Sequence, residues 1–499
     1  MPSVARRASG GRARPSAAAA IAGASGPSRR TIARAETPRG VAGATIVSCG
    51  RIAGSVARAA PAASALGKRL EASARRRIVP PAVSPETPFL TAEQARRVAD
   101  EHGTPCYVYS QERLEAAADA MLAFPAAFGL TVRYAMKASP SAAILRLFHR
   151  KGLHIDASSG WEVRRAMRAG FAPDRISLST QQLPEDIGEL LALGVEVNAC
   201  SLAQVDRIGA VAPGRAIGLR FNPGKGSGGT GKTNVGGSDS SFGIWHGWAD
   251  EAAARAARAG LRVVRIHTHI GSGSDPAVWQ AVADLSLALV ARFPDATTLN
   301  LGGGYKVARV DGEKATDPAV VGVPVRAAFE RFAEATGRRL RLEVEPGTFL
   351  VANAGAVLAR VVDVVRTDTR AFAKLDTGMT ELLRPSLYGA QHPVTLLSGS
   401  AEAEPTVVVG HCCESGDLIT CAPGESETLA PRLLPRCASG DLAIVGGAGA
   451  YCAAMSAKNY NSFPEAPEVL IGRDGRAHLI RRRQTLDQML ANESVPEGL

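Results

Sequence analysis

Three polar groups with complementary chemistry follow separate apolar runs of the chain: Lys137, the triplet Gly302–Gly304 and Glu345. A lysine amine in its neutral form can build a Schiff base with an aldehyde. Backbone N–H groups in a glycine turn can hold a phosphate, and a carboxylate can keep a cofactor's ring nitrogen protonated. Together these groups indicate chemistry on an aldehyde cofactor that is bound through its phosphate.

Two other groups of side chains have the composition of metal ligands. His267 and His269 are two residues apart and would lie on one side of a strand, but no further ligand cluster accompanies them. Cys412 and Cys413 follow His411, but adjacent side chains on a strand point in opposite directions. We therefore predict no metal site.

Two glycine-rich stretches resemble nucleotide-binding loops. Gly226–Thr233 matches the pattern GxxxxGK[ST], which works only when a helix begins at its Lys-Thr pair. The next residues, Asn234–Ser241, are poor at starting a helix, and Gly446–Gly449 lacks the spacing of a dinucleotide fingerprint. We predict that neither stretch binds a nucleotide.

The elements that must position these groups are visible from residue 108 to 355 as short apolar runs alternating with segments of helical period. The runs predict strands at Val132–Met136, His154–Ala157, Ile176–Ser179, Val195–Ala199, Ile217–Phe221, Val263–Ile270, Leu299–Leu301 and Leu340–Val344. The intervening segments predict helices at Ser139–Lys151, Trp161–Gly170, Pro184–Leu193, Ala249–Gly260, Asp275–Phe293 and Pro324–Gly337. This alternation favours a (β/α)8 barrel, in which Lys137, His269, Gly302–Gly304 and Glu345 would share the mouth at the strands' C-terminal ends.

Beyond residue 355 the pattern changes to β-branched runs with turn signals, such as Ala356–Val365, Thr406–Val409 and Leu442–Val445. This change predicts an appended, mostly-β C-terminal domain over residues 356–499. The segment 81–107 leads into Cys106–Tyr109 and is also strand-like, and we expect it to join that β domain. The predicted fold class is therefore α/β, a barrel with a second domain.

The basic residues are concentrated at the N-terminus. Residues 1–80 hold 15 Lys or Arg and two acids, a charge of +13, whereas the rest of the chain carries −2. This leader is rich in Ala, Ser, Gly and Arg and has no apolar stretch of about 18 residues. We expect a disordered transit peptide and a chloroplast (plastid stroma) location, with the mitochondrion as the weaker alternative.

Charge and cysteine usage narrow the classes of partner. Because the basic excess is confined to the leader, we expect neither a nucleic-acid nor a membrane partner for the rest of the chain. The eight cysteines show no CxxC pairing and suit free thiols in a reducing compartment.

Several short motifs occur in one order along the chain: YAMKA, HTHIGSG, LGGG, VEPG, RPSLYG, CESGD, GAY and YNS. In this order they resemble diaminopimelate decarboxylase, a pyridoxal-phosphate-dependent family with an alanine-racemase-like barrel and an appended β domain. The resemblance covers roughly residues 85–490. It implies pyridoxal 5'-phosphate as cofactor and decarboxylation of meso-2,6-diaminopimelate to L-lysine and carbon dioxide, the last step of lysine biosynthesis.

The same resemblance implies roles for single residues around the cofactor. Lys137 would form the Schiff base, His269 would stack on the ring, and Glu345 would pair with the ring nitrogen. The full set of cofactor contacts that it implies is Lys137, Asp156, His269, Ser272, Gly302, Gly303, Gly304, Glu345 and Tyr451.

On the substrate side, the resemblance implies that Arg384 and Tyr388 grip the distal carboxylate. Glu414 would meet the distal amine, and Cys413 would assist protonation of the carbanion. Cys413, Glu414 and Tyr451 would complete the neighbouring subunit's site, with Tyr451 also near the substrate. A homodimer with shared active sites follows.

The chain departs from the family pattern at the substrate site. Thr348 replaces the arginine of the usual EPGR motif, so a hydroxyl stands in place of a charged bidentate contact. This departure keeps open a related decarboxylase acting on ornithine, arginine, lysine or carboxynorspermidine, although CESGD and RPSLYG argue against it. A catalytically silent homologue is the other alternative, and the presence of Lys137, Glu345 and Cys413 together argues against that.

Overall fold

The computed structural model of the protein describes residues 88–226, 236–269 and 273–499. The expected transit peptide at residues 1–80 lies outside the described residues. So do Ser272 and all of the Gly226–Thr233 stretch except Gly226.

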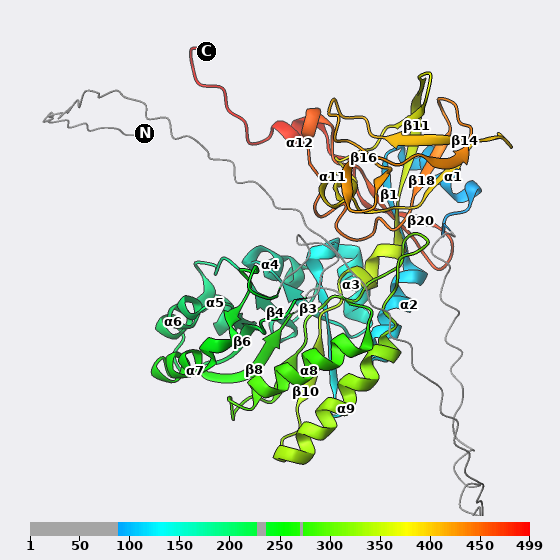
Figure 1. Ribbon diagram of the computed structural model, residues 1–499. Helices are drawn as coiled ribbons and strands as arrows, with labels where there is room; N and C mark the ends of the chain where they lie inside the picture. Colours follow the sequence, from blue (N-terminus) through cyan, green and yellow to red (C-terminus); the bar gives the residue numbers. More distant parts are fainter. Residues whose placement is uncertain (1–87, 227–235, 270–272) are drawn as a thin grey trace, which may run out of the picture. The chain divides into compact units, whose positions relative to one another are not determined.

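Parallel strands close into a barrel in the order β2-β3-β4-β5-β6-β8-β9-β10, with β10 returning to β2 (Figure 1). Their bounds are β2 Leu130–Ala135, β3 His154–Ala157, β4 Ile176–Ser179, β5 Glu196–Ala199, β6 Ala216–Asn222, β8 Arg262–Thr268, β9 Thr298–Asn300 and β10 Arg341–Val344. The short β7, Ile244–Trp245, adds to β6. The expected eight-stranded barrel is confirmed, with each strand within two residues of its predicted bounds.

Helices connect successive barrel strands and surround them (Figure 1). Their bounds are α2 Gln111–Leu122, α3 Ala142–Arg150, α4 Gly160–Arg168, α5 Ile187–Ala192, α6 Leu202–Val211, α7 Ala249–Arg258, α8 Pro276–Val290, α9 Pro318–Thr336 and the single turn α10 Thr348–Val351. Each of the longer helices turns an apolar face to the barrel; in α3, for example, Ile144, Leu145 and Phe148 are buried. All six predicted helices are present.

The C-terminal part is mostly β, as predicted, and is built on a sheet with the order β17-β14-β12-β11-β1-β19-β20, to which β18 and β13 add alongside β11. Its strands are β1 Cys106–Ser110, β11 Gly355–Arg366, β12 Ala371–Leu375, β13 Val394–Leu397, β14 Ala403–Val409, β17 Arg432–Pro435, β18 Leu442–Val445, β19 Glu468–Ile471 and β20 Ala477–Arg481. A separate hairpin, β15 Cys421–Ala422 with β16 Glu425–Leu429, and two helices, α11 Leu383–Tyr388 and α12 Leu486–Leu490, complete this part. β1 pairs with both β11 and β19, so a strand that precedes the barrel in sequence lies inside this sheet.

The expectation that residues 81–107 form a strand segment is wrong for most of its described length, which folds as α1, Ala92–His102. Thr91 caps this helix and forms a capping box with Gln94. Ala95, Val98 and Ala99 recur at helical spacing and are buried. Their small and β-branched side chains resemble a strand in composition, but their period is that of a helix.

Three barrel-side helices also differ from the prediction. α2 and α6 were not predicted, although Ser110 and Ser201 cap them with hydrogen bonds to Arg113 N and Gln204 N. α9 starts six residues before the predicted start, because Asp317 caps it and Pro324 is accommodated within the helix. Among the described residues, no helix is long and apolar enough to span a membrane.

Candidate active site

The barrel brings the predicted groups to one mouth because each follows the C-terminal end of a strand. Lys137 follows β2, His269 follows β8, the Gly302–Gly304 turn follows β9 and Glu345 follows β10. β8, β9 and β10 are consecutive neighbours in the barrel, and β10 pairs with β2. The four groups therefore lie at the end of the barrel where enzymes of this architecture place their active sites.

Lys137 lies beside a buried carboxylate. Its Nζ is 3.4 Å from Oδ2 of Asp156, the second-last residue of β3, and 41% of the Lys137 side chain is exposed against 3% for Asp156. Burial opposes the charge on Lys137, but Asp156, Tyr451 and Glu345 together outweigh it and raise the pKa of the amine. Burial raises the pKa of Asp156, whose other oxygen, Oδ1, has no hydrogen-bond partner among the described residues. The pair orients the amine towards the barrel mouth.

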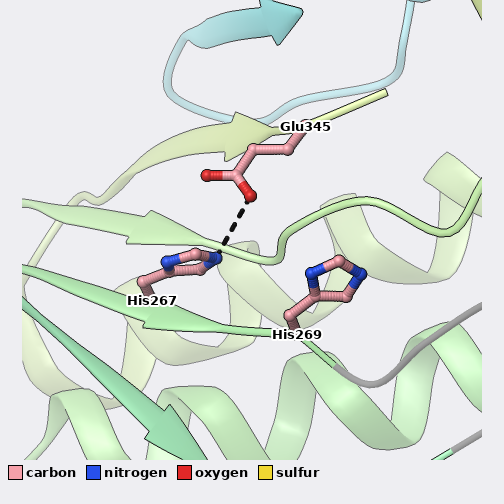
Figure 2. Close-up of side chains that lie close together, drawn as sticks. All are labelled: His267, His269 and Glu345. Atoms are coloured by element: carbon pink, nitrogen blue, oxygen red, sulfur yellow. Dashed lines mark ion pairs between the residues drawn. The ribbon is translucent and has the colours of Figure 1, made fainter. Parts of the chain in front are cut away.

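Glu345 is a buried carboxylate held from two sides, of which Figure 2 shows the side towards His267. His267 Nε2 lies 3.2 Å from its Oε2, and Asn300 Nδ2 donates to its Oε1 at 2.7 Å. Burial by itself would raise the pKa of Glu345, but His267, His269 and Lys137 lower it below the usual value. The carboxylate therefore stays ionised at neutral pH.

The glycine turn packs too tightly against the backbone of Glu345 and against His269 to carry side chains. A Cβ on Gly303 would lie 2.4 Å from the backbone oxygen of Glu345, and one on Gly302 would lie 2.8 Å from Cγ of His269. Asn300 also accepts a hydrogen bond from the backbone N–H of Gly302 at 2.8 Å, which fixes the turn. The result is a stretch of backbone without side chains beside Glu345 and His269, as a phosphate-carrying ligand needs.

His269 is held neutral at the mouth. Burial and the charges of Arg220 and Lys137 lower its pKa to about 3. In Figure 2 its ring lies beside His267 and Glu345. One ring nitrogen of each histidine and one oxygen of Glu345 lie within 4.8 Å of one another. Glu345 is therefore a third donor beside the two histidines, with the geometry of a metal-binding group, and this grouping was not predicted from the sequence.

Two residues of the mouth were missed in the sequence. Asn300 holds both Glu345 and the glycine turn, and Arg220 acts on the pKa of His269 and of Lys137. Asn300 is the last residue of β9, whereas Arg220 lies two residues before the end of β6. The position at a strand end, which led to Lys137 and Glu345, could have found Asn300 as well.

Tyr451 requires a correction. It was expected to complete the site of a neighbouring subunit, but its backbone N–H donates to the carbonyl oxygen of Ala138, next to Lys137 in the same chain, at 2.8 Å. Tyr451 has a positive φ of 56°, at the turn that follows the Gly446–Gly449 stretch. That turn carries the tyrosine back to the barrel mouth of its own chain, a path that a motif alone does not reveal.

The expected substrate residues lie on two short helices. Arg384 Nη1 bonds Nε2 of His392 at 3.0 Å, and the Tyr388 hydroxyl lies 4.0 Å from the sulfur of Met455. Arg384 and Tyr388 belong to α11, whereas Thr348 begins α10, three residues after Glu345. The charge of Arg384 acts on the pKa of Tyr451, which places α11 on the same side of the site as Tyr451.

Cys413 and Glu414 are exposed, and their hydrogen bonds lie within the C-terminal part. The backbone N–H of Cys413 donates to Oδ1 of Asn461 at 2.8 Å, and Glu414 accepts from Gly416 N at 3.1 Å. Neither bonds to Lys137 or Glu345 within the described chain. The structure thus brings together the cofactor-side group of predicted residues, and leaves this pair on the surface.

Comparison with known proteins assigns this arrangement. A family model described as the pyridoxal-binding domain of pyridoxal-dependent decarboxylases matches residues 112–352. A diaminopimelate decarboxylase of Escherichia coli K12 is 38% identical over 416 residues, covering 81% of this chain and 97% of the relative. The chain belongs to the diaminopimelate decarboxylase family.

Solved structures of this family agree with the assignment. A crystal structure of a diaminopimelate decarboxylase has a TM-score of 0.76 at 37% identity and covers 81% of this chain and 96% of its own. The diaminopimelate decarboxylase of Helicobacter pylori, solved in complex with L-lysine, has a TM-score of 0.71 at 27% identity and covers 79% and 98%. The protein is a pyridoxal-phosphate-dependent carboxy-lyase.

Proposed function

We propose that the protein decarboxylates meso-2,6-diaminopimelate to L-lysine and carbon dioxide, the last step of lysine biosynthesis. The observation that carries the proposal is the convergence of Lys137, the Gly302–Gly304 turn and the ionised Glu345 at one barrel mouth. The relatives named above, which match nearly their whole length, favour this substrate over ornithine, arginine, lysine or carboxynorspermidine.

The residues at the mouth fit pyridoxal 5'-phosphate. The glycine turn offers its phosphate backbone without side chains, and Asp156 keeps a buried oxygen beside Lys137 that no described residue pairs. Lys137 would anchor the cofactor, His269 would lie on its ring, and Glu345 would meet its ring nitrogen, with Tyr451 alongside. When bound, the cofactor supplies an electron sink for the carbanion that loss of carbon dioxide leaves.

The chain's own residues would prepare and complete this reaction. Glu345 stays ionised and so favours a positive charge in front of it, and the neutral His269 adds none of its own. Asp156 orients the amine of Lys137. Arg384, Tyr388 and Thr348 would bind the substrate's distal end, and the thiol of Cys413 would deliver the proton that replaces carbon dioxide.

A product analysis tests this function. The full chain, loaded with cofactor, is incubated with the meso, LL and DD isomers of diaminopimelate, and with ornithine, arginine and lysine, beside a Lys137→Ala variant. We expect L-lysine from the meso isomer only, and none from the variant. Release of an amine from one of the other amino acids would move the function to that decarboxylase, and no turnover at all would refute catalysis.

We propose further that the enzyme is a homodimer with shared active sites. Cys413 and Glu414 carry the chemistry expected of a proton donor and an amine ligand, yet they are exposed, and among the described residues they bond only within the C-terminal part. A second copy that presents these two residues to the Lys137 mouth would explain this placement. Tyr451 is not part of the shared set, because it reaches its own chain's mouth.

We also propose that residues 1–80 are a transit peptide that directs the enzyme to the plastid stroma. The charge of +13 and the near absence of acids in this segment support the proposal. A fusion of residues 1–80 to a fluorescent protein should enter plastids. Accumulation in mitochondria would favour the alternative organelle, and a cytosolic signal would refute a targeting role.

A further inference from the structure

A buried arginine outside the predicted set and Arg384 are connected through the adjacent carbonyls of Gly447 and Gly446, the first directly and the second through His392. Arg309 belongs to the loop between the glycine turn and α9, and only 6% of it is exposed. Its Nε donates to the carbonyl oxygen of Gly447 at 3.0 Å, whereas its Nη2 is buried and has no hydrogen-bond partner among the described residues. An unsatisfied donor on a buried cation is costly, so it calls for an acceptor.

The surroundings of Arg309 make that acceptor an anion. Burial, and next the charge of Arg384, lower the pKa of Arg309 to about 9. The strongest opposing charge is that of the exposed Glu313, whose carboxylate accepts a hydrogen bond from the backbone N–H of Arg309 rather than from its guanidinium. Two guanidinium groups that repel each other are stabilised when an anion binds between them.

Arg384 likewise lacks a carboxylate partner in the described part of the chain. Its Nη1 donates to Nε2 of His392, whose Nδ1 faces the carbonyl oxygen of Gly446 at 2.9 Å. Because that carbonyl can only accept, the proton of His392 is on Nδ1 and its Nε2 accepts from Arg384. Burial lowers the pKa of His392, so the ring is neutral and leaves the charge of Arg384 uncompensated.

The segment Gly447–Tyr451 connects this arginine pair to the reaction site. Gly447 accepts from Arg309, and Tyr451 donates its N–H to Ala138, beside Lys137. A Cβ on Gly447 would lie 2.8 Å from Cγ and Cδ of Arg309, so the glycine allows the arginine to pack at this position. Both Arg309 and Arg384 act on the pKa of the neighbouring Cys452 thiol. The short segment from Gly447 to Tyr451 therefore connects the two cations to the mouth of the barrel.

We propose that Arg309 and Arg384 together bind the carboxylate at the end of the substrate that does not react. This inference rests on the proposed function, because it assigns the second carboxylate of a diamino dicarboxylic acid. It also accounts for Thr348: Arg309 supplies from the β9–α9 loop the second cation that position 348 lacks. A monocarboxylic diamino acid such as ornithine would leave Nη2 of Arg309 unpaired, so the pair selects dicarboxylic substrates.

The test separates binding from catalysis with three variants of the full chain loaded with cofactor. Arg309→Gln removes the charge, Arg309→Lys keeps the charge but not the fork of donors, and Arg338→Gln is the matched control. Arg338 donates to the carbonyl oxygens of Val290, Phe293 and Ala296, away from the mouth. We measure KM and kcat for meso-diaminopimelate, the Kd of L-lysine by calorimetry, and the visible absorbance of the bound cofactor.

We expect Arg309→Gln to raise KM and the Kd of L-lysine about 10- to 100-fold, because a charged hydrogen bond to the retained carboxylate is lost. The lysine variant should fall between it and the wild type, and cofactor absorbance should not change. Unchanged KM and Kd in a folded Arg309→Gln protein would overturn the inference, and if that variant does not fold, an unchanged Arg309→Lys would do so. If the wild type makes no lysine but binds it through Arg309, the proposed function fails while the anion site stands.

Discussion

His267 and Glu345 meet across the barrel mouth, with Nε2 of the histidine 3.2 Å from Oε2 of the glutamate, although β9 lies between their strands (Figure 2). Both side chains are almost fully buried. Burial lowers the pKa of His267, while His267 in turn lowers that of Glu345. The contact therefore fixes a carboxylate that remains ionised in front of the Lys137 site.

Glu345→Gln should abolish most of the activity while the protein still folds. The amide has the same shape and can keep the hydrogen bond with Asn300, but it lacks the charge that stabilises a protonated ring nitrogen. We expect kcat to fall by about 10²- to 10³-fold, in line with the loss of one preorganised electrostatic contact. Steady-state kinetics and the visible spectrum of the bound cofactor measure the effect.

Glu330→Gln is the control for that substitution. Glu330 forms an exposed pair with Arg326 on α9, four residues apart on the same helix. Its loss should leave kcat unchanged, since such pairs contribute little. A Glu345→Gln enzyme as active as this control would show that the carboxylate does not serve the reaction.

Gly303→Ala should weaken cofactor binding. The new methyl group would lie 2.4 Å from the backbone oxygen of Glu345, so either the turn or the end of β10 must move. Overpacking of this kind costs about 1–3 kcal/mol, part of which we expect to appear as a higher Kd for pyridoxal 5'-phosphate. Fluorescence titration of the cofactor-free protein, with thermal unfolding in parallel, measures both parts.

Gly399→Ala is the matched control, because a Cβ there meets no atom within 4 Å. It should bind the cofactor as the wild type does. If Gly303→Ala also bound it with wild-type affinity, the turn would not be the phosphate site.

The barrel could be predicted from the sequence because local patterns determine it. The apolar runs, the breakers between them and the polar residue after each run are all read within a few residues, and so Lys137, His269 and Glu345 could be placed at one mouth. α1 was not predicted because its segment was judged by its composition, whereas the helical spacing of its buried residues is what identifies it. Helices and strands can be predicted locally where the spacing of the apolar residues is clear.

Contacts between distant segments could not be predicted in the same way. Tyr451 reaches its own barrel mouth only because a turn at positive φ redirects the chain towards Ala138. Arg309, 75 residues before Arg384, reaches the carbonyl next to the one that holds the Arg384–His392 pair, through a loop that shows no periodic pattern. Both placements depend on the fold of the whole chain, and no motif encodes them.

A buried cluster of charged side chains inside the barrel, Glu343 with Arg133 and Arg265, should make the stability of the fold depend on pH below about 4.5. Glu343 on β10 lies 2.7 Å from Arg133 and 3.0 Å from Arg265. Burial would raise its pKa, but the two arginines outweigh this and lower it from 4.5 to about 2. Between these values the unfolded chain binds a proton that the folded chain does not, so stability falls as pH falls from 4.5 towards 2. The contribution is on the order of 3 kcal/mol, present in full above pH 4.5.

Glu343→Gln isolates this contribution in urea unfolding at pH 7 and pH 3. The variant should lose about 3–5 kcal/mol at pH 7, since it leaves buried arginines with less compensating charge, and the difference from the wild type should narrow at pH 3. Glu402→Gln, which removes an exposed partner of Arg436, serves as control and should change little at either pH. An equal loss at both pH values would mean that titration of Glu343 is not involved.

Shared active sites predict complementation between two inactive chains. Lys137→Ala removes the amine of a chain's own mouth, and Cys413→Ala removes the thiol that we propose it lends to its partner. Each variant alone should have little activity, because every site lacks one of the two groups.

In a mixed dimer one site carries both defects and the other carries neither. Random mixing makes half of the dimers mixed, so activity should recover to about a quarter of the wild-type value. Co-expression with two affinity tags isolates the mixed dimer and measures its kcat per site. A mixed dimer as inactive as its parents would place Cys413 in its own chain's site, because each chain would then carry its own defect.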